Sequence, residues 1–74
     1  MVPLSELQRA ALASFIYNVG TGAFERSTLL RKLNRGDLTG ACNELRRWNK
    51  AAGQVWQGLT NRREAERMLC LEKL

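Results

Sequence analysis

The longest uncharged stretch of this chain runs from Ala10 to Phe24, although 26% of all residues are charged. Apolar side chains fall on every side of a helix drawn through its first part, among them Phe15 and Val19. A helix that is apolar on all sides has no solvated face and belongs in the interior of a protein. Gly20 follows, and glycine readily adopts the left-handed conformation that ends helices. The pattern therefore predicts a central helix over about residues 6–19.

Capping residues mark where the first helices begin. Ser5, followed three residues later by Gln8, has the form of a capping box at the start of the central helix. Ser27 or Thr28 is in the right place to cap a leucine-rich helix that continues to about Leu33. Two of the expected helix starts thus carry a side chain that can accept the free backbone N–H groups of the first turn.

The middle of the chain predicts one short turn at residues 24–26 and a further helix over about residues 38–48. Gly36 is expected to end the preceding helix and Asp37 to cap the new one. Gly40 weakens this helix, and close packing against another helix is the expected reason for it. The apolar side chains recur at helical spacing and form one face: Leu38, Ala41, Cys42, Leu45 and Trp48.

The C-terminal third begins with the least regular segment, residues 49–59, which is interpreted as a loop that anchors Trp56. The last helix is expected to open at Thr60 or Asn61, because Asn61 and Glu64 have the spacing of a capping box. The apolar side of this helix is expected to consist of Ala65, Met68, Leu69 and Leu71.

These elements predict an all-α fold of four to five helices packed around the central apolar helix, as a single domain over residues 1–74. No strand pattern or internal repeat is found in the sequence. No run approaches the eighteen apolar residues typical of a membrane span, and no secretory leader is expected before the first helix.

The net charge of +5 suggests an anionic partner, such as nucleic acid, a lipid surface or bacterial cell wall. The basic residues are spread along the chain, with doublets at 31–32, 46–47 and 62–63. Solvated helix faces account for most of them equally well. Charge alone therefore does not identify the partner.

The sequence offers little for catalysis. It has no histidine and only two cysteines, so a Cys/His zinc site is excluded and the commonest general base is missing. We expect no metal, no cofactor and no complete catalytic site. The acids are all expected on solvated helix starts and charged faces, without a raised pKa: Glu6, Glu25, Asp37, Glu44, Glu64, Glu66 and Glu72.

The two cysteines, Cys42 and Cys70, lie on different predicted helices. A reduced pair and a disulfide are both compatible with their positions. A bridge would close a loop of about 28 residues, stabilise the fold by roughly 3 kcal/mol and require an oxidising compartment.

Four side chains are candidates for contact with a ligand. Trp48, Trp56 and Tyr17 can stack on sugars or bases, although tryptophans also anchor small cores. Asn18 is a polar residue at the end of an apolar helix. Its amide can either cap that helix or bind a molecule that approaches closely over Gly20.

Five motifs in order then show a resemblance. They are F-x-x-N-x-G-x-G-x-F at residues 15–24, STLLRKLN at 27–34, GD at 36–37, LRRWNKA at 45–51 and GLTNRREAE at 58–66. Together they resemble the C-terminal lobe of phage-type lysozymes, glycoside hydrolase family 24, and in particular lambdoid phage and prophage endolysins. The resemblance covers nearly the whole chain.

The resemblance implies a two-lobed helical lysozyme whose catalytic glutamate, aspartate and threonine lie in an N-terminal lobe. That motif does not occur in this sequence, so no catalytic residue is assigned. The resemblance implies that Tyr17 and Asn18, with Gly20, line the substrate cleft. It also implies that Arg62 or Arg63, at the start of the last helix, faces the catalytic glutamate, and that the two cysteines are paired.

The expected function is that of the substrate-cleft lobe of a muramidase, which cleaves the β-1,4 bond between N-acetylmuramic acid and N-acetylglucosamine. The chain alone is expected to be inactive and to bind glycan or stem peptide weakly. The alternative is an interaction module that binds cell wall, a complementary lobe or a second copy through the first helix. No specific nucleic-acid partner is expected. The intact protein is expected in the periplasm or host cell wall, and the chain expressed alone in the cytoplasm.

Overall fold

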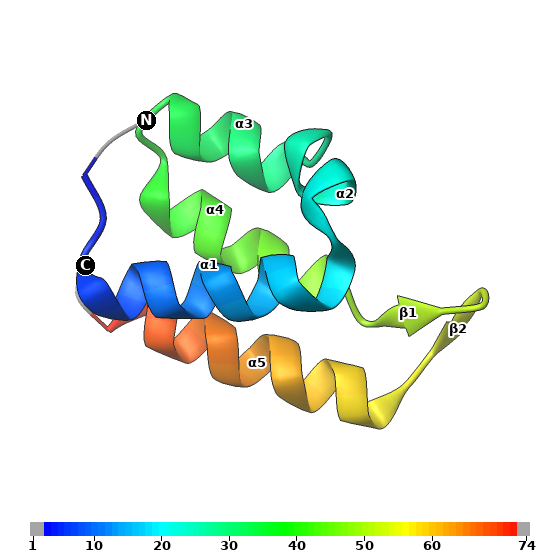
Figure 1. The fold of residues 1–74 in the computed structure, drawn as a ribbon. Coiled ribbons are helices and arrows are strands. Elements are labelled where there is room, and N and C mark those ends of the chain that lie inside the picture. Colours follow the sequence, from blue (N-terminus) through cyan, green and yellow to red (C-terminus); the bar gives the residue numbers. More distant parts are fainter. Residues whose placement is uncertain (1–2, 73–74) are drawn as a thin grey trace.

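Two long antiparallel helices form one side of the molecule (Figure 1). They are α1 (Glu6–Val19) and α5 (Gln57–Leu71), and they pack along most of their lengths. The computed structural model describes residues 3–72. On the other side lie the short helices α2 (Thr21–Glu25), α3 (Thr28–Asn34) and α4 (Leu38–Glu44). A 3₁₀ turn, η1 (Leu45–Arg47), and a hairpin of β1 (Lys50–Ala51) and β2 (Gln54–Val55) lead into α5. The predicted mostly helical fold is confirmed.

Helix α1 begins and ends at the predicted residues. The Ser5 hydroxyl accepts the Gln8 N–H at 3.1 Å, and the Gln8 side chain accepts the Ser5 N–H at 2.9 Å, which completes the capping box. Gly20 ends the helix with its N–H donated to the Ile16 carbonyl at 2.7 Å. Its φ of 92° and ψ of 151° lie near a region that essentially only glycine enters, and differ from the left-handed helical conformation expected there.

The central helix is buried on one face only. Phe15 is fully buried and meets the edges of the Phe24 and Trp48 rings, at centroid distances of 6.4 and 5.2 Å. Ala10, Ala13 and the neighbouring polar positions face solvent. The core consists of Ala11, Leu12, Phe15, Leu29, Leu33, Ala41, Cys42, Leu45 and Cys70. The apolar circumference of α1 therefore does not mean that it is enclosed, because small alanines on its outer face expose little apolar surface.

The helices α3 and α4 follow the predicted caps. Ser27 accepts the Leu30 N–H, and Asp37 accepts the Gly40 N–H, each at 3.0 Å. Gly36 has a φ of 82°, as a helix-ending glycine requires. A Cβ on Gly40 would collide with the Asp37 carboxylate. The missing side chain of Gly40 therefore makes room for the cap of its own helix.

Two further predictions are corrected in this middle segment. The short turn expected at residues 24–26 is the end of a longer helix, α2, which starts directly after Gly20. The helix expected over residues 38–48 changes from α to 3₁₀ geometry after Glu44. Trp48 therefore lies directly after the 3₁₀ turn and not on the α-helical face where it was predicted.

The segment over residues 49–59 was predicted to be a loop, and it forms a hairpin instead. Lys50 pairs with Val55 in an antiparallel ladder, and Ala52 and Gly53 turn the chain with φ of 52° and 78°. Positive φ at both central positions is typical of tight hairpin turns. The Trp56 indole N–H donates to the Ala51 carbonyl at 2.9 Å, which anchors this ring as expected.

Helix α5 starts at Gln57, before the predicted Thr60 or Asn61. Asn61 accepts a hydrogen bond from the Gln57 side chain at 2.8 Å and does not cap the helix. The predicted apolar side of α5 is also wrong in part, because Ala65 and Met68 are exposed and Met68 remains 64% accessible. The buried positions of this helix are Arg63, Glu66 and Cys70.

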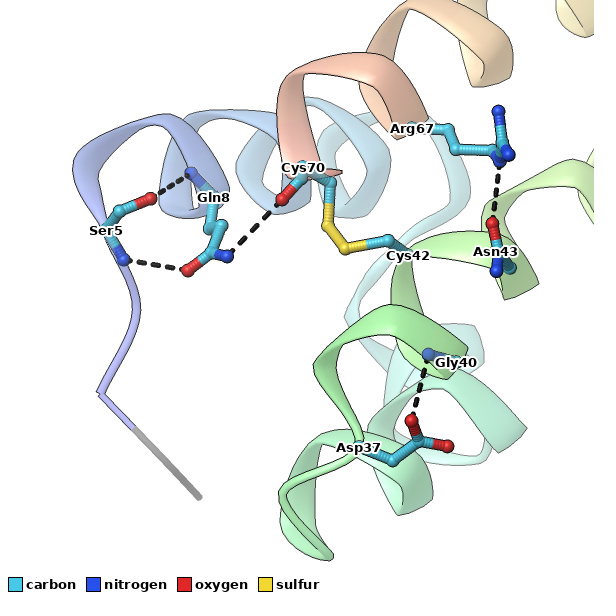
Figure 2. The surroundings of a disulfide bond; sticks show 8 residues. All are labelled: Ser5, Gln8, Asp37, Gly40, Cys42, Asn43, Arg67 and Cys70. Atoms are coloured by element: carbon cyan, nitrogen blue, oxygen red, sulfur yellow. Dashed lines mark hydrogen bonds between the residues drawn. A yellow bond between two sulfur atoms is a disulfide. The ribbon is translucent and has the colours of Figure 1, made fainter. Parts of the chain in front are cut away.

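A disulfide joins α4 to the end of α5 (Figure 2). The Cα atoms of Cys42 and Cys70 lie 5.7 Å apart, and both side chains are buried. The Gln8 amide donates to the Cys70 carbonyl at 3.3 Å, so the capping box of α1 also contacts the last turn of α5. The implied pairing of the cysteines is confirmed. No helix within residues 3–72 is long and apolar enough to cross a membrane.

Candidate functional site

The C-terminal end of α1 borders a hollow of about 380 Å³. Its walls are Asn18 and Val19 from α1, Trp48 after η1, Lys50 and Ala51 from the hairpin, and Leu59 from α5. Tyr17 is 92% exposed, which is the largest exposure of any large apolar side chain in the described residues. An amide, a cation and an aromatic ring thus line one open hollow. The exposed Tyr17 ring precedes Asn18 in sequence and is not part of the lining.

A buried ion pair contacts one of the residues that line this hollow, Asn18. Arg63 and Glu66, one helical turn apart on α5, are 1% and 5% exposed. Their side chains meet twice, with Nε to Oε1 at 2.6 Å and Nη2 to Oε2 at 2.8 Å. The Ser14 hydroxyl donates to the same carboxylate from α1. Arg63 Nη1 donates to Asn18 Oδ1 at 2.9 Å, and the guanidinium carbon lies 5.4 Å from the centre of the Phe15 ring.

This network is costly to bury and must be complete. Removing two charges from water carries a penalty of several kcal/mol per ion, which only good geometry and further hydrogen bonds offset. Here each charge has the other as a partner, and the hydroxyl and the amide from α1 add to the pairing. The face of Phe15 contributes a cation–π contact. The two long helices are therefore locked together by polar contacts near the hollow.

The residues singled out from the sequence do not form one cluster. Asn18 and Arg63 are brought into contact, and Gly20 and Tyr17 lie within two residues of Asn18. Arg62 is exposed and borders a different depression, between α1 and α5. Because α5 starts at Gln57, the two arginines lie in its second turn rather than at its N-terminus.

Two members of the network were not singled out from the sequence. Glu66 was assigned to a solvated face, and this was wrong, because its carboxylate is enclosed between α1 and α5. Ser14 was not considered at all. The spacing of Arg63 and Glu66, three residues apart on one helix, is the signal that could have indicated the pair.

The two tryptophans have different roles. Trp48 is half-buried, packs edge-on against Phe15 and separates the hollow at Asn18 from a second one of about 380 Å³. That second hollow is bordered by Arg26, Arg47 and the start of α3. Trp56 is half-exposed on the hairpin, held by its indole N–H. Trp48 thus serves the core and the surface at once.

Comparison with known proteins shows to which family this fold belongs. The phage lysozyme family matches residues 1–66. This chain belongs to the phage lysozyme family. It is 59% identical over 70 residues to the SAR-endolysin of Bacteriophage PS119, and 57% to that of Enterobacteria phage P21, covering 95% of this chain and 42% of each relative. The fold resembles an endolysin from Escherichia coli O157:H7 phage FAHEc1, with a TM-score of 0.88 and 31% identity.

That structural match covers 100% of this chain and 49% of the FAHEc1 protein. The endolysin of Bacillus phage B103 is 51% identical, and 27% of its length is covered. The chain therefore spans less than half the length of these relatives. The resemblance inferred from the five motifs is confirmed.

Three carboxylates of this chain, Glu44, Glu64 and Glu66, are engaged in ion pairs. Burial alone would raise the pKa of Glu44, but hydrogen bonds from Lys32 and Arg47 outweigh it and hold the pKa below its ordinary value. The hydrogen bond from Arg46, with the charge of Arg67, lowers the pKa of Glu64. These two carboxylates therefore stay ionised at neutral pH. Within residues 3–72, no group of three metal-binding side chains comes together.

A second surface of the phage lysozyme chain is apolar. A groove of about 320 Å³ between α1 and α5 is lined by Ala10, Ala11, Ser14, Arg62, Ala65, Glu66 and Leu69. It adjoins a shallower apolar depression around Met68, Leu69 and Leu71. This strip is the exposed flank of α1 joined to the side of α5 that was expected to be buried.

Proposed function

We propose that this chain is the C-terminal substrate-cleft lobe of a peptidoglycan-degrading endolysin. In the intact enzyme, the reaction is hydrolysis of the β-1,4 bond between N-acetylmuramic acid and N-acetylglucosamine. Membership of the phage lysozyme family and the similarity to proteins named endolysin support this assignment. The observation that carries it is the hollow at the end of α1, where Asn18, Lys50 and Trp48 offer polar and aromatic contacts to a glycan or its stem peptide.

Each proposed site residue has a defined role. Tyr17, fully open to solvent, provides a face for stacking on a sugar ring. Asn18 provides a hydrogen bond, and the missing side chain of Gly20 lets a ligand approach the backbone. Arg62, exposed and without a protein partner among the described hydrogen bonds, is the arginine of the pair that remains available to face an acid of a further lobe. Arg63 is already paired with Glu66.

The 74-residue chain by itself is proposed to bind weakly and not to hydrolyse. A retaining or inverting glycosidase needs one carboxyl group that stays protonated to donate a proton. Glu44 and Glu64 have lowered pKa values, and Glu66 is held by Arg63 and Ser14. None of these three is suited to be that acid.

The direct test is to measure binding and lysis together. Purified chain is incubated with insoluble peptidoglycan, and both the bound fraction after sedimentation and the turbidity are recorded. We expect weak, salt-sensitive binding without clearing, and a loss of binding in Tyr17→Ser. Met68→Ser is the matched control, because it removes another exposed apolar side chain outside the hollow. Clearing at the rate of an intact endolysin would contradict inactivity, and absence of binding would contradict the cleft assignment.

A second candidate function is supported by the apolar strip between α1 and α5. In this alternative the chain is an interaction module that binds a complementary lobe or a second copy. Sedimentation velocity across a range of concentrations tests self-association, with Met68→Glu and Ala65→Glu as disrupting variants. A concentration-dependent dimer that both variants abolish would support it. A monomer at all concentrations restricts the partner to a different polypeptide, which is tested by adding a separately expressed N-terminal lobe of a relative.

The compartment proposed for the intact protein is the periplasm or cell wall. The buried bridge between Cys42 and Cys70 supports this, because disulfides form and persist in oxidising compartments. Relatives named SAR-endolysin and endolysin are consistent with action at the wall.

A further inference from the structure

The buried network at Arg63 fixes more than the packing of α1 on α5. It also fixes which end of the Asn18 amide faces the ligand. An asparagine amide has an acceptor oxygen at one end and a donor NH₂ group at the other, and its shape is nearly the same either way round. The orientation is therefore decided by the chemistry of the group that the amide meets inside the protein.

Arg63 allows only one orientation. Its guanidinium carries five N–H donors and no acceptor, and it remains charged at all relevant pH values. The hydrogen bond of 2.9 Å from Arg63 Nη1 must therefore end on Asn18 Oδ1. The NH₂ group of this exposed side chain consequently points away from the guanidinium, and no protein acceptor for it is found within residues 3–72.

The guanidinium itself cannot turn to release this constraint. Its Nη2 donates to Glu66 Oε2 at 2.8 Å, its Nε lies 2.6 Å from Glu66 Oε1 as an ion-pair contact, and the Phe15 ring lies beside it. Ser14 donates to Glu66 from α1 and so holds the carboxylate in turn. A buried ion pair of this kind is often no more stabilising than apolar side chains of the same volume. The feature that apolar side chains could not supply is the directed N–H at Asn18.

The second polar side chain of the hollow has the same character. Besides Asn18, two lining residues have a polar group in the side chain: Lys50 has an ammonium group and Trp48 has an indole N–H. A lysine ammonium is a donor without acceptor capacity, and an indole N–H is a donor as well. Every polar side chain that borders the hollow therefore offers hydrogen-bond donors to a ligand.

We propose that Arg63 is a positioning residue that presents Asn18 as a hydrogen-bond donor, so that the hollow selects an acceptor oxygen of an amide or carboxylate group. This inference rests on the proposed function, because peptidoglycan is taken as the source of that group. Two parts of peptidoglycan carry it. The glycan has acetamido carbonyls, and the stem peptide has backbone carbonyls and carboxylates.

The first experiment asks whether the Asn18 NH₂ group binds an acceptor, and from which source. The ¹⁵N-labelled chain is titrated in one arm with peptide-free glycan strands and in the other with free stem peptide, and the side-chain amide signals are followed by NMR. We expect the Asn18 NH₂ signals to shift in one arm, which identifies the source. A glycan or peptide that shifts other signals while leaving Asn18 unchanged would contradict the proposal.

Asn18→Asp separates the two ends of the amide. The variant keeps an oxygen for Arg63, has nearly the same shape and replaces the outward donor by an acceptor. The fold is expected to persist, and the affinity for the fragment found above is expected to fall by about tenfold, as for the loss of one hydrogen bond. Asn18→Asp binding as tightly as the wild type would overturn the proposal.

The role of Arg63 is tested in the double variant Arg63→Met/Glu66→Leu, which leaves no unpaired buried charge. The chain is expected to remain folded, while the ¹⁵N heteronuclear NOE of the Asn18 side chain decreases and the affinity falls by about threefold to tenfold. The matched control is Arg46→Met/Glu64→Leu, which removes an exposed ion pair between η1 and α5 without touching Asn18. It is expected to leave the Asn18 signals in place.

The outcomes distinguish this inference from the proposed function. If the wild type binds peptidoglycan and the double variant keeps both its affinity and the ordered Asn18 side chain, the positioning role of Arg63 is refuted and the proposed function remains. If the wild type binds neither fragment nor whole peptidoglycan, both are refuted.

Discussion

Helix α5 is held in its middle and at its C-terminal end by different chemistry. Its last turn is joined to α4 by the covalent bond between Cys42 and Cys70, and Gln8 adds one hydrogen bond from α1. Its second and third turns are held by the charges of Arg63 and Glu66, together with the polar side chains that reach them from α1. Figure 1 shows α5 lying alongside α1, in the opposite direction.

The two linkages differ in how far they fix the directions of neighbouring side chains. A disulfide stabilises chiefly by restricting the unfolded chain, and it tolerates small changes in the groups around it. The ion pair gives little net stabilisation over an apolar pair, but its donors and acceptors impose directions on neighbouring side chains. The middle of α5, which is linked to the hollow through Asn18, has the directional linkage, and its C-terminal end has the covalent one.

The largest effect is expected from breaking only one half of the ion pair. Arg63→Met leaves the Glu66 carboxylate buried without its partner, and loss of one member of a buried pair costs about 3–5 kcal/mol. A chain of this length has a total stability of only about 4–11 kcal/mol. Urea titration followed by circular dichroism should therefore show a chain that is at least half unfolded, or one with a much lower midpoint.

Removing both charges is the control for this prediction. Arg63→Met/Glu66→Leu is expected to recover most of the lost stability, to within about 1–2 kcal/mol of the wild type. If the single and double variants are equally unstable, the two side chains stabilise the fold through their packing volume and not through their charges. The contrast between the two linkages is then lost.

A slightly smaller effect is expected at the covalent end. Reduction of the disulfide, or Cys42→Ala/Cys70→Ala, removes a link across a sequence separation of 28 residues. The chain-entropy relation gives a loss of about 3–4 kcal/mol for this loop. Thermal unfolding with and without a reductant measures it, and the alanine variant, which has no bridge, should not respond to the reductant.

The two linkages should also differ in their effect on the Asn18 side chain. In the folded fraction of the reduced protein, the Asn18 side-chain signals are expected to remain unchanged, because the polar network does not involve the cysteines. A change in these signals on reduction would show that the covalent end also controls the hollow.

The smallest effect is expected from acid, at a site away from both linkages. The folded-state pKa of Glu44 lies below its ordinary value of 4.5, so its ion pairs with Lys32 and Arg47 stabilise the fold fully above that pH. This contribution is lost as the pH falls below 4.5 through the folded-state pKa. In Glu44→Gln, the free energy of unfolding should decrease less steeply as the pH falls through this range. The difference from the wild type should be no more than about 1 kcal/mol. An unchanged slope would mean that other carboxylates dominate.

Local signals in the sequence predicted most of α1, α3 and α4 correctly. The capping box of Ser5 and Gln8, the caps at Ser27 and Asp37, and the glycine at position 20 all act within one helical turn. Such contacts depend on neighbours in sequence, so the sequence contains all the information needed to find them.

Helix α5 could not be predicted in the same way. Its buried face carries Arg63 and Glu66, whereas Ala65 and Met68 face outward, so the rule that apolar residues face the core pointed to the wrong side. Burial of these charges depends on Ser14 and Asn18, which lie more than forty residues away along the chain. The hairpin was not predicted either, because it contains only two residues in each strand.

The bridge between Cys42 and Cys70 also makes a closed ring of covalent bonds that contains η1, the hairpin and nearly all of α5. The exposed hairpin turn at Ala52 and Gly53 lies on this ring. A protease that cuts there produces two polypeptides that remain one molecule until a reductant is added. The same turn is therefore a place where the backbone can be opened, or a probe inserted, while both halves of the domain stay attached to each other.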